Sequence, residues 1–352
     1  MASIRFGATT GADINLPFNG NISVDDMVID IANDNLSIGF NTPIVDANTR
    51  HYFAMDDSVT RNDGVSGVAL AYEHASQELI TVNPWQNAGH VKFNQFTRGN
   101  VTDNYSYSGD GMTIEAWVLL VNGTAERTLL HNSSSPYNST FLRFDYIGVP
   151  GFIACGLAGG LLFATGITAG WHHIAACTDV NGRRLFVDGE VVSTTTGPSP
   201  GETSGTIRVG RNATNGTRFL NTNFDSLAIH TTSRYPEAFW AGRYHQFGTA
   251  TMNYNLVGYK PTSISWSTTT DSTYGQVYQV YVYDVTMGWT QVGGDNPTSP
   301  IPITGLTIGS SSPIKVIMSP STDTLHEKTP ILDWIQMDYS TIANRIVMLS
   351  YF

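Results

Sequence analysis

Short runs of alternating apolar and polar residues, each ended by Gly, Asn or Asp, fill the middle of the chain. In residues 113–118 (TIEAWV), Ile114 and Val118 fall on one face of an extended segment and Glu115 on the other, because successive strand side chains point to opposite faces. Comparable runs lie at 170–175, 182–189, 206–210 and 223–229. Brief strands separated by turn residues predict an all-β sandwich.

A second alternating pattern occupies the last hundred residues. Tyr278, Val280 and Val282 alternate with Gln279, Tyr281 and Tyr283, a period of two that predicts a half-buried strand. Further strand candidates lie at 301–303, 313–318 and 331–339. These runs predict a second, smaller β-sandwich at 249–352, with Tyr281 and Tyr283 on a candidate exposed aromatic face.

Residues 1–49 form a separate segment in this scheme. They hold several aspartates, and Arg5 is the one lysine or arginine before Arg50. The segment is too short for a core of its own, which leaves two alternatives. It forms an extra sheet or arm laid on the main sandwich, or it is an arm that docks the protein to a larger particle or to its own partners in a trimer. The predicted domains are therefore 1–49, 50–248 and 249–352.

Four motifs of the central region occur in a familiar order: TIEAWV at 113–118, GWHHIA at 170–175, LFVDGE at 185–190 and DSLAIH at 225–230. This series resembles the laminin-G-like or concanavalin A-like jelly-roll family. The resemblance implies a jelly roll over 50–248. It also implies a closing segment with a short helical turn at 233–241, which Ser233 could cap. The fold alone does not fix a function, since it serves lectins, adhesion modules, enzyme appendages and virion decorations.

Charge excludes two classes of partner. Charged residues make up only 13% of the chain, the formal net charge is −11, and the pI is about 5.1. A nucleic-acid binder needs a basic stripe to neutralise phosphates, and the sequence offers no lysine or arginine cluster beyond Arg183-Arg184. We therefore expect no nucleic acid and no anionic membrane surface as partner. No apolar run reaches the length of a membrane helix, so no membrane insertion is expected.

The sequence predicts no catalytic residues. Glucanases of concanavalin-like fold carry paired carboxylates in a Glu-x-Asp-x-x-Glu strand, whereas Glu115 stands alone and Asp145 has no acidic partner two residues on. His172 and His173 are adjacent on a strand, so their rings point to opposite faces and cannot bind one ion from the same side. The one Gly-x-Ser-x-Gly match, at 197–201 (GPSPG), is not a nucleophile elbow, because Pro200 after the serine has no backbone N–H to bind an oxyanion.

The sequence does not decide which ligands the protein binds. The resemblance makes calcium the most credible ion, with Asp225, Asp56 and Asp57 as candidate ligands; the alternative is that these carboxylates are solvated or cap turns. Sugar binding would use aromatic residues in loop-like stretches, and we assign the tryptophans on strands to packing. The loop candidates are Trp85, Tyr137 and Trp289, and the strand residues are Trp117, Trp171 and Trp334.

Cys155 and Cys177 both lie among apolar neighbours, as reduced buried thiols do. A disulfide between them is the alternative, which the sequence leaves open.

The functional hypothesis joins these features. Residues 329–335 (TPILDWI) resemble the last strand of small sandwich modules in phage tail and fibre proteins. With the jelly roll, the low charge and no visible signal peptide, they favour a bacteriophage virion protein assembled in the host cytoplasm. It would be a tail fibre, receptor-binding or capsid-decorating subunit, oligomeric and most simply trimeric, with cell-surface glycans as candidate ligands. The alternatives are a carbohydrate-binding or adhesion module of a secreted cellular protein, and a glycan-cleaving enzyme.

Overall fold

The computed structural model describes most of the strands and the turns that join them. The described residues are 2–7, 22–25, 27–30, 35–38, 43, 45–55, 70–73, 78–80, 90–93, 98–107, 111–132, 140–157, 160–197, 202–211, 219–252, 259–270, 275–309, 313–322 and 328–341. In these ranges the regular elements are β-strands and one 3-10 turn, Tyr146–Gly148. The prediction of an all-β protein is confirmed, and no helix in these ranges is long and apolar enough to cross a membrane.

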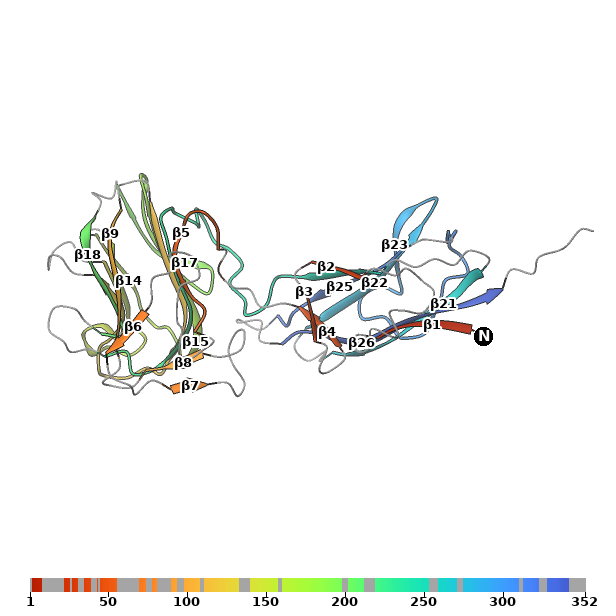
Figure 1. Ribbon diagram of the computed structural model, residues 1–352, viewed down its shortest axis with the longest axis horizontal. Coiled ribbons are helices and arrows are strands. Elements are labelled where there is room, and N and C mark those ends of the chain that lie inside the picture. The colour runs from red at the N-terminus through yellow and green to blue at the C-terminus, as the bar shows by residue number, and fades with distance from the viewer. Residues whose placement is uncertain are drawn as a thin grey trace, which may run out of the picture. The chain divides into compact units, whose positions relative to one another are not determined.

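The chain divides into two compact units. The middle unit comprises Asn41–Arg243, and the terminal unit comprises Met1–Phe40 together with Tyr244–Phe352. Each unit contains two antiparallel sheets, as Figure 1 shows.

The middle unit pairs an eight-stranded with a seven-stranded sheet. The eight-stranded sheet has the order β17 (Glu190–Thr196), β16 (Gly182–Val187), β15 (Gly170–Asp179), β10 (Met112–Leu120), β19 (Asn223–His230), β8 (His90–Lys92) and β7 (Glu78–Ile80), and β5 (Thr49–Phe53) also pairs with β19. The seven-stranded sheet has the order β14 (Gly160–Ala164), β13 (Ile153–Leu157), β12 (Thr140–Phe144), β11 (Arg127–Asn132), β18 (Glu202–Val209), β9 (Arg98–Tyr107) and β6 (Leu70–Glu73).

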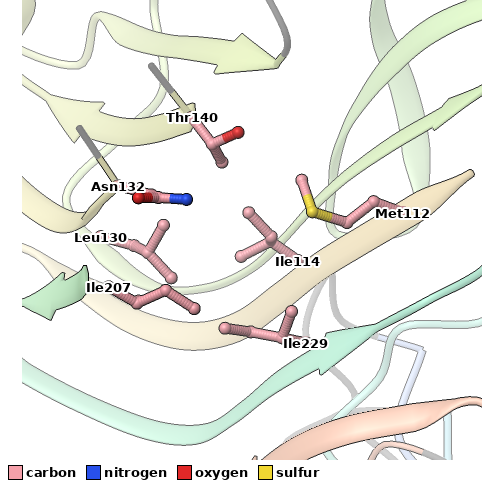
Figure 2. A pocket seen from close by; sticks show the side chains of 7 residues that line it. All are labelled: Met112, Ile114, Leu130, Asn132, Thr140, Ile207 and Ile229. Atoms are coloured by element: carbon pink, nitrogen blue, oxygen red, sulfur yellow. The ribbon is translucent and has the colours of Figure 1, made fainter. Parts of the chain in front are cut away.

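The core of the middle unit lies between these sheets. Ile114 and Val118 of β10 belong to the same buried cluster as Leu130 of β11 and Leu142 of β12. A small pocket in this cluster is lined mainly by aliphatic side chains, with Asn132 as one of two polar residues (Figure 2). It has room for about one water molecule and is therefore a packing defect, not a ligand site.

The outer face of the eight-stranded sheet is also covered. Residues 231–243, which we call the closing segment, follow β19, and Tyr235 and Phe239 of this segment pack against Cys177 and Phe186. The Tyr235 and Phe239 rings stack with centroids 3.6 Å apart. The closing segment runs through bends without the helical turn that we expected, and Pro236 disfavours helical backbone at Tyr235.

The hairpin turn at Asp188-Gly189 is as predicted. Both residues have positive φ angles, 52° and 81°, the combination that a tight I′ turn between β16 and β17 requires. The Phe239 backbone N–H donates to the Gly189 carbonyl, and a Cβ at Gly189 would lie 1.9 Å from the Phe239 carbonyl oxygen. Glycine therefore serves two purposes here: it makes the turn and admits the closing segment.

The question left open about the cysteines is resolved. Both thiols are free and fully buried. Cys155 belongs to the core between the sheets, whereas Cys177 packs under the closing segment.

The terminal unit is a second sandwich. One sheet has six strands, in the order β24 (Ile301–Pro302), β21 (Tyr259–Thr269), β26 (Ile331–Thr341), β4 (Asn35–Ile38) and β3 (Met27–Asp30), with β1 (Ala2–Gly7) also paired to β26. The other has five, in the order β2 (Ile22–Asp25), β20 (Gly248–Met252), β25 (Ile314–Ser319), β22 (Val277–Asp284) and β23 (Gly288–Val292). Val280 and Val316 of the second sheet share a core with Ile264 and Ile335 of the first.

The sequence left residues 1–49 as an extra sheet or arm on the main sandwich, or as a docking arm, and in the structure β1 to β4 are strands of the terminal unit. β1 pairs with β26 along its whole length, and β4 also pairs with β26. β2 pairs with β20 in the other sheet. The first forty residues therefore supply strands to both sheets of the terminal unit.

A chain that lacks residues 1–40 should lose the terminal unit and keep the middle unit. Deletion removes strands from both terminal sheets, while the middle unit retains every strand described for it. We expect one thermal transition in calorimetry, matching that of an isolated 41–243 fragment, and rapid proteolysis within 244–352. Protease resistance of 244–352 in the truncated chain would show that β1–β4 are accessory.

Candidate functional site

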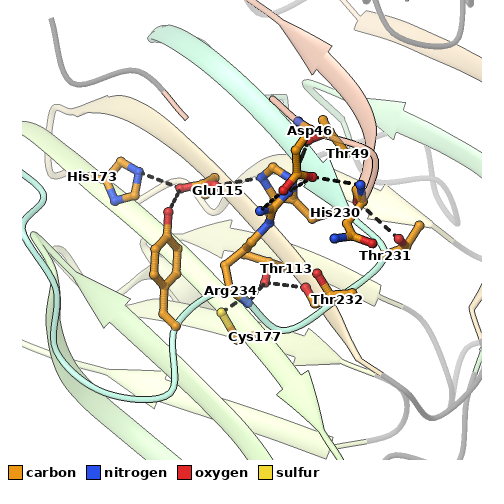
Figure 3. Close-up of polar contacts among 12 residues, drawn as sticks. Asp46, Thr49, Thr113, Glu115, His173, Cys177, His230, Thr231, Thr232 and Arg234 are labelled. Carbon is orange, nitrogen blue, oxygen red and sulfur yellow. Dashed lines mark hydrogen bonds and ion pairs between the residues drawn. The ribbon is translucent and has the colours of Figure 1, made fainter. Parts of the chain in front are cut away.

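Glu115 is the centre of a buried polar cluster on the outer face of the eight-stranded sheet (Figure 3). Its carboxylate receives three partners: His230 Nε2 at 2.8 Å from Oε1, His173 Nε2 at 3.2 Å from Oε2, and the Tyr235 hydroxyl at 2.7 Å from Oε2. The strands flanking β10 supply the two histidines, because Trp117 opposes His173 on β15 and Thr113 opposes His230 on β19. The closing segment supplies Tyr235.

These bonds keep Glu115 ionised in the interior. Burial alone would raise the pKa of its carboxyl, but the hydrogen bonds from His173 and His230 outweigh that effect and lower the pKa to about 2. The His230 tautomer follows from its other contact, since Nδ1 lies 3.1 Å from Arg234 Nη2, which can only donate. His230 Nδ1 is therefore an acceptor, and Nε2–H donates to Glu115.

Arg234 connects this cluster to the segment before β5. Its guanidinium donates to both Asp46 carboxylate oxygens, at 2.7 and 2.5 Å. The Arg234 bond and the backbone N–H of Asn48 lower the pKa of Asp46 to about 2. We call Glu115, His173, His230, Arg234 and Asp46 the clasp. Together with Tyr235, these residues connect the closing segment to strands β10, β15 and β19 through hydrogen bonds and ion pairs.

The clasp is not arranged for glycoside hydrolysis. A retaining glycosidase places a second carboxylate about 5 Å from the first across an open cleft. Glu115 is 1% exposed and its oxygens are engaged by histidine and tyrosine. It offers no free oxygen to a sugar, and its chemistry is that of a structural anchor.

The two adjacent histidines have different partners. His172 Nδ1 lies 2.7 Å from Asp188 Oδ2, and its Nε2 lies 3.0 Å from the Thr168 carbonyl. His173 faces Glu115 instead. The described residues contain no group of three or more His, Cys, Asp or Glu that could hold a metal ion.

Of the three calcium candidates, the structure describes Asp225. Asp225 lies in β19, is fully buried, and accepts a hydrogen bond from the Ser226 hydroxyl at 3.3 Å. Asp56 and Asp57 lie outside the described residues. Asp145 forms a 2.7 Å ion pair with Arg127 and accepts hydrogen bonds from the backbone N–H groups of Gly123 and Gly151, a structural role.

The predicted aromatic face of the second sandwich is present. Tyr283 and Trp289 stand opposite each other on β22 and β23, are 39% and 38% exposed, and meet edge to face at 5.5 Å between ring centroids. Tyr281 lies two residues before Tyr283 on β22, on the same face, and is half-buried. Lys315 of β25 places Nζ 4.4 Å from the Trp289 centroid and 5.2 Å from the Tyr281 centroid.

Polar groups border this face. Asp295 Oδ1 accepts hydrogen bonds from the side-chain amides of Gln279, at 2.5 Å, and Gln291, at 3.2 Å. The Tyr281 hydroxyl donates to the Gln279 amide oxygen at 3.1 Å. We call the surface formed by Tyr281, Tyr283, Trp289 and Lys315, with Gln279, Gln291 and Asp295 at its border, the aromatic face.

Of the tryptophans assigned to packing, Trp117 is buried, in edge contact with His173 at 5.3 Å. Trp171 is half-buried beside His90, and Trp334 lies in β26. Trp85 and Tyr137 lie outside the described residues. Of the three sugar-binding candidates, Trp289 is therefore the one whose neighbouring residues the structure describes.

Sequence reasoning missed most of the clasp. It noted Glu115 but not His230, 115 residues away, nor Arg234 and Asp46, which are 188 apart. A glutamate among apolar residues on a predicted central strand was the available signal, because a buried charge requires a partner. The alternation placed Gln279 on the same face as Tyr281 and Tyr283, but Lys315, Gln291 and Asp295 were not identified as part of the aromatic face.

Residues 86–238 match the family described as the concanavalin A-like lectin/glucanases superfamily. The matched residues lie within the middle unit, which therefore contains a concanavalin A-like jelly-roll domain. No curated protein matches the chain as a whole or in part.

Similar solved structures include domain 4 of AbnA, an extracellular arabinanase from Geobacillus stearothermophilus, in complex with arabinotriose. That match has 13% identity and a TM-score of 0.43, over 55% of this chain and 96% of the other. The Trypanosoma rangeli sialidase with sialic acid matches at 13% identity and a TM-score of 0.40, over 55% of this chain and 34% of the sialidase chain. The binding domain of botulinum neurotoxin DC, in complex with SialylT, matches at 9% identity and 0.42, over 82% and 99%.

Replacing Glu115 by Gln should destabilise the middle unit by about 3 kcal/mol at pH 7, because it breaks a buried charge network. The pKa of Glu115 is depressed from the usual 4.5 to about 2, so its contribution is complete above pH 4.5 and is lost as pH falls toward 2. The difference between parent and variant in urea unfolding should therefore shrink over that range.

Glu190→Gln is the matched control, since Glu190 is exposed in the same unit. It should change stability by less than about 0.5 kcal/mol. The clasp would not have this role if Glu115→Gln left the free energy of unfolding unchanged, or if the loss of stability were the same at pH 5 and pH 2.5.

Proposed function

We propose that this chain is a non-catalytic carbohydrate-binding protein displayed on the surface of a bacteriophage particle, as a tail-fibre, receptor-binding or capsid-decorating subunit. The observation that carries the binding function is the aromatic face, where Tyr283 and Trp289 are held exposed beside amide and carboxylate groups. The carboxylate of Glu115, in contrast, is buried and cannot be reached by a glycan.

The chemistry of the aromatic face suits a pyranose ring. Tyr and Trp present rigid apolar surfaces with polar handles, and one face of a sugar ring is lined by C–H groups that pack on such rings. The hydroxyls at the ring edge need donors and acceptors when they lose water, and Gln279, Gln291 and Asp295 provide both. A site built on two partly exposed rings binds a sugar weakly, so an oligomer such as a trimer would gain affinity by presenting several copies.

The virion setting is supported by other features. With 13% charged residues, the surface of the chain must be mostly uncharged and polar, which suits tight packing in an assembly. Both cysteines are free thiols buried in the fold, so the middle unit needs no oxidising compartment to form. The same aromatic face would also serve the alternative, a binding module of a secreted cellular protein.

Trp289→Ala should weaken glycan binding by about tenfold or more without unfolding the protein, because the ring is partly exposed and its loss removes a stacking surface. Binding would be screened on a glycan array and measured by calorimetry on the best hits. Val180→Ala is a matched control, since Val180 is an exposed apolar residue of the middle unit and should leave affinity unchanged. Equal affinity of parent and Trp289→Ala would place the site elsewhere.

The chain should co-purify with intact phage particles in a density gradient, in a copy number divisible by three. Immunogold electron microscopy should then label the particle surface, and light scattering of the isolated protein should give a trimer. Recovery outside the particle band, with glycan binding retained, would favour the secreted module over the virion protein.

A further inference from the structure

Lys315 occupies the middle of the aromatic face. On β25 it stands opposite Tyr281 of β22, and Tyr281 in turn stands opposite Gln291 of β23. Its ammonium lies between two rings, 4.4 Å from the Trp289 centroid and 5.2 Å from the Tyr281 centroid. Both distances are within the range of cation–π attraction, so the cation is held at a defined place beside the exposed rings.

The electrostatic partners of Lys315 within the described residues are these two rings, with no carboxylate among them. Ring quadrupoles attract a cation but leave its charge uncompensated. The nearby acid of the aromatic face, Asp295, is bound by the amides of Gln279 and Gln291 instead. A chain with 29 acidic and 18 basic residues thus keeps a cation without an acidic partner beside its exposed tryptophan.

We propose that the aromatic face selects carbohydrates that carry a carboxylate, with that carboxylate bound by Lys315 while the sugar ring stacks on Trp289 or Tyr283. This inference rests on the proposed carbohydrate-binding function. A carboxylate attached to a pyranose lies at the ring edge, so one sugar residue can stack and form the ion pair together. Sialates and hexuronates share this chemistry.

The ion pair with Lys315 would determine the preference for acidic over neutral sugars more than the overall affinity for sugars. Stacking on the rings is available to any pyranose, whereas a charge-assisted hydrogen bond rewards only the acidic one. Because Lys315 is half-exposed, the preference should also weaken with salt, which screens charges beyond about 8 Å at physiological ionic strength.

Two matched probe pairs test this by calorimetry. Trigalacturonate is compared with its fully methyl-esterified form, and 3′-sialyllactose with its methyl ester; within each pair the charge is the principal difference. The parent protein should bind the acidic member of at least one pair about tenfold more tightly than the neutral member. The pair that shows the preference identifies hexuronate or sialate as the recognised sugar.

Lys315→Met should reduce that preference to about twofold or less while neutral binding stays within twofold of the parent. Lys92→Met is the matched control, because it removes the same charge from an exposed position of the middle unit and should preserve the preference. Near-ultraviolet circular dichroism would verify that Lys315→Met keeps the native packing around Trp289.

Two results would overturn the role of Lys315 and leave the proposed carbohydrate binding in place. These are equal binding of acidic and neutral probes by the parent, or an unchanged preference in Lys315→Met. Absence of binding to all four probes, and to every glycan on the array, would overturn the proposed function together with it. A preference that survives Lys315→Met but is lost in Lys92→Met would assign the carboxylate to the middle unit and equally refute the role of Lys315.

Discussion

The middle unit depends on burying both faces of its eight-stranded sheet. One face packs on the seven-stranded sheet through residues such as Ile114 and Val118. The other face carries Glu115 and Trp117, each 1% exposed, so it requires a cover of its own. The closing segment provides the cover, and the Glu115 carboxylate can be buried only because His173, His230 and Tyr235 replace the water that it loses.

The clasp also explains where the closing segment lies. Apolar packing is not directional, so the contacts of Tyr235 and Phe239 with Phe186 would tolerate a shift along the sheet. The Tyr235–Glu115 hydrogen bond and the bidentate Arg234–Asp46 pair do not, because each requires particular atoms at particular places. Specific polar contacts of this kind position the segment, while the apolar contacts supply most of its binding free energy.

Local sequence patterns predicted what local geometry determines. Asp188-Gly189 predicted a hairpin because the turn needs positive φ at both residues, and Tyr281 and Tyr283 predicted an exposed face because strand side chains alternate. The helical turn in the closing segment was wrong, since Pro236 and the need to lie flat on the sheet favour extended backbone.

Contacts between distant residues could not be predicted in this way. The pairing of β1 with β26 depends on which sheet has a free edge, and nothing in residues 2–7 specifies that edge. The same holds for His230 and Glu115, whose meeting depends on the order of strands in the sheet. A buried glutamate predicts that a partner exists without identifying it.

Among the described residues, Phe163 and Trp289 each belong to an exposed aromatic surface, and the neighbours of these two rings differ. Phe163 on β14 is 40% exposed, packs on Tyr146 and Phe152, and has the aliphatic Leu161 beside it, 48% exposed. Trp289 has comparable exposure but lies beside Lys315 and among amide and carboxylate groups. Because sugar hydroxyls that leave water need hydrogen-bonding partners, carbohydrate recognition fits the Trp289 surface, and the Phe163 surface suits an apolar contact instead.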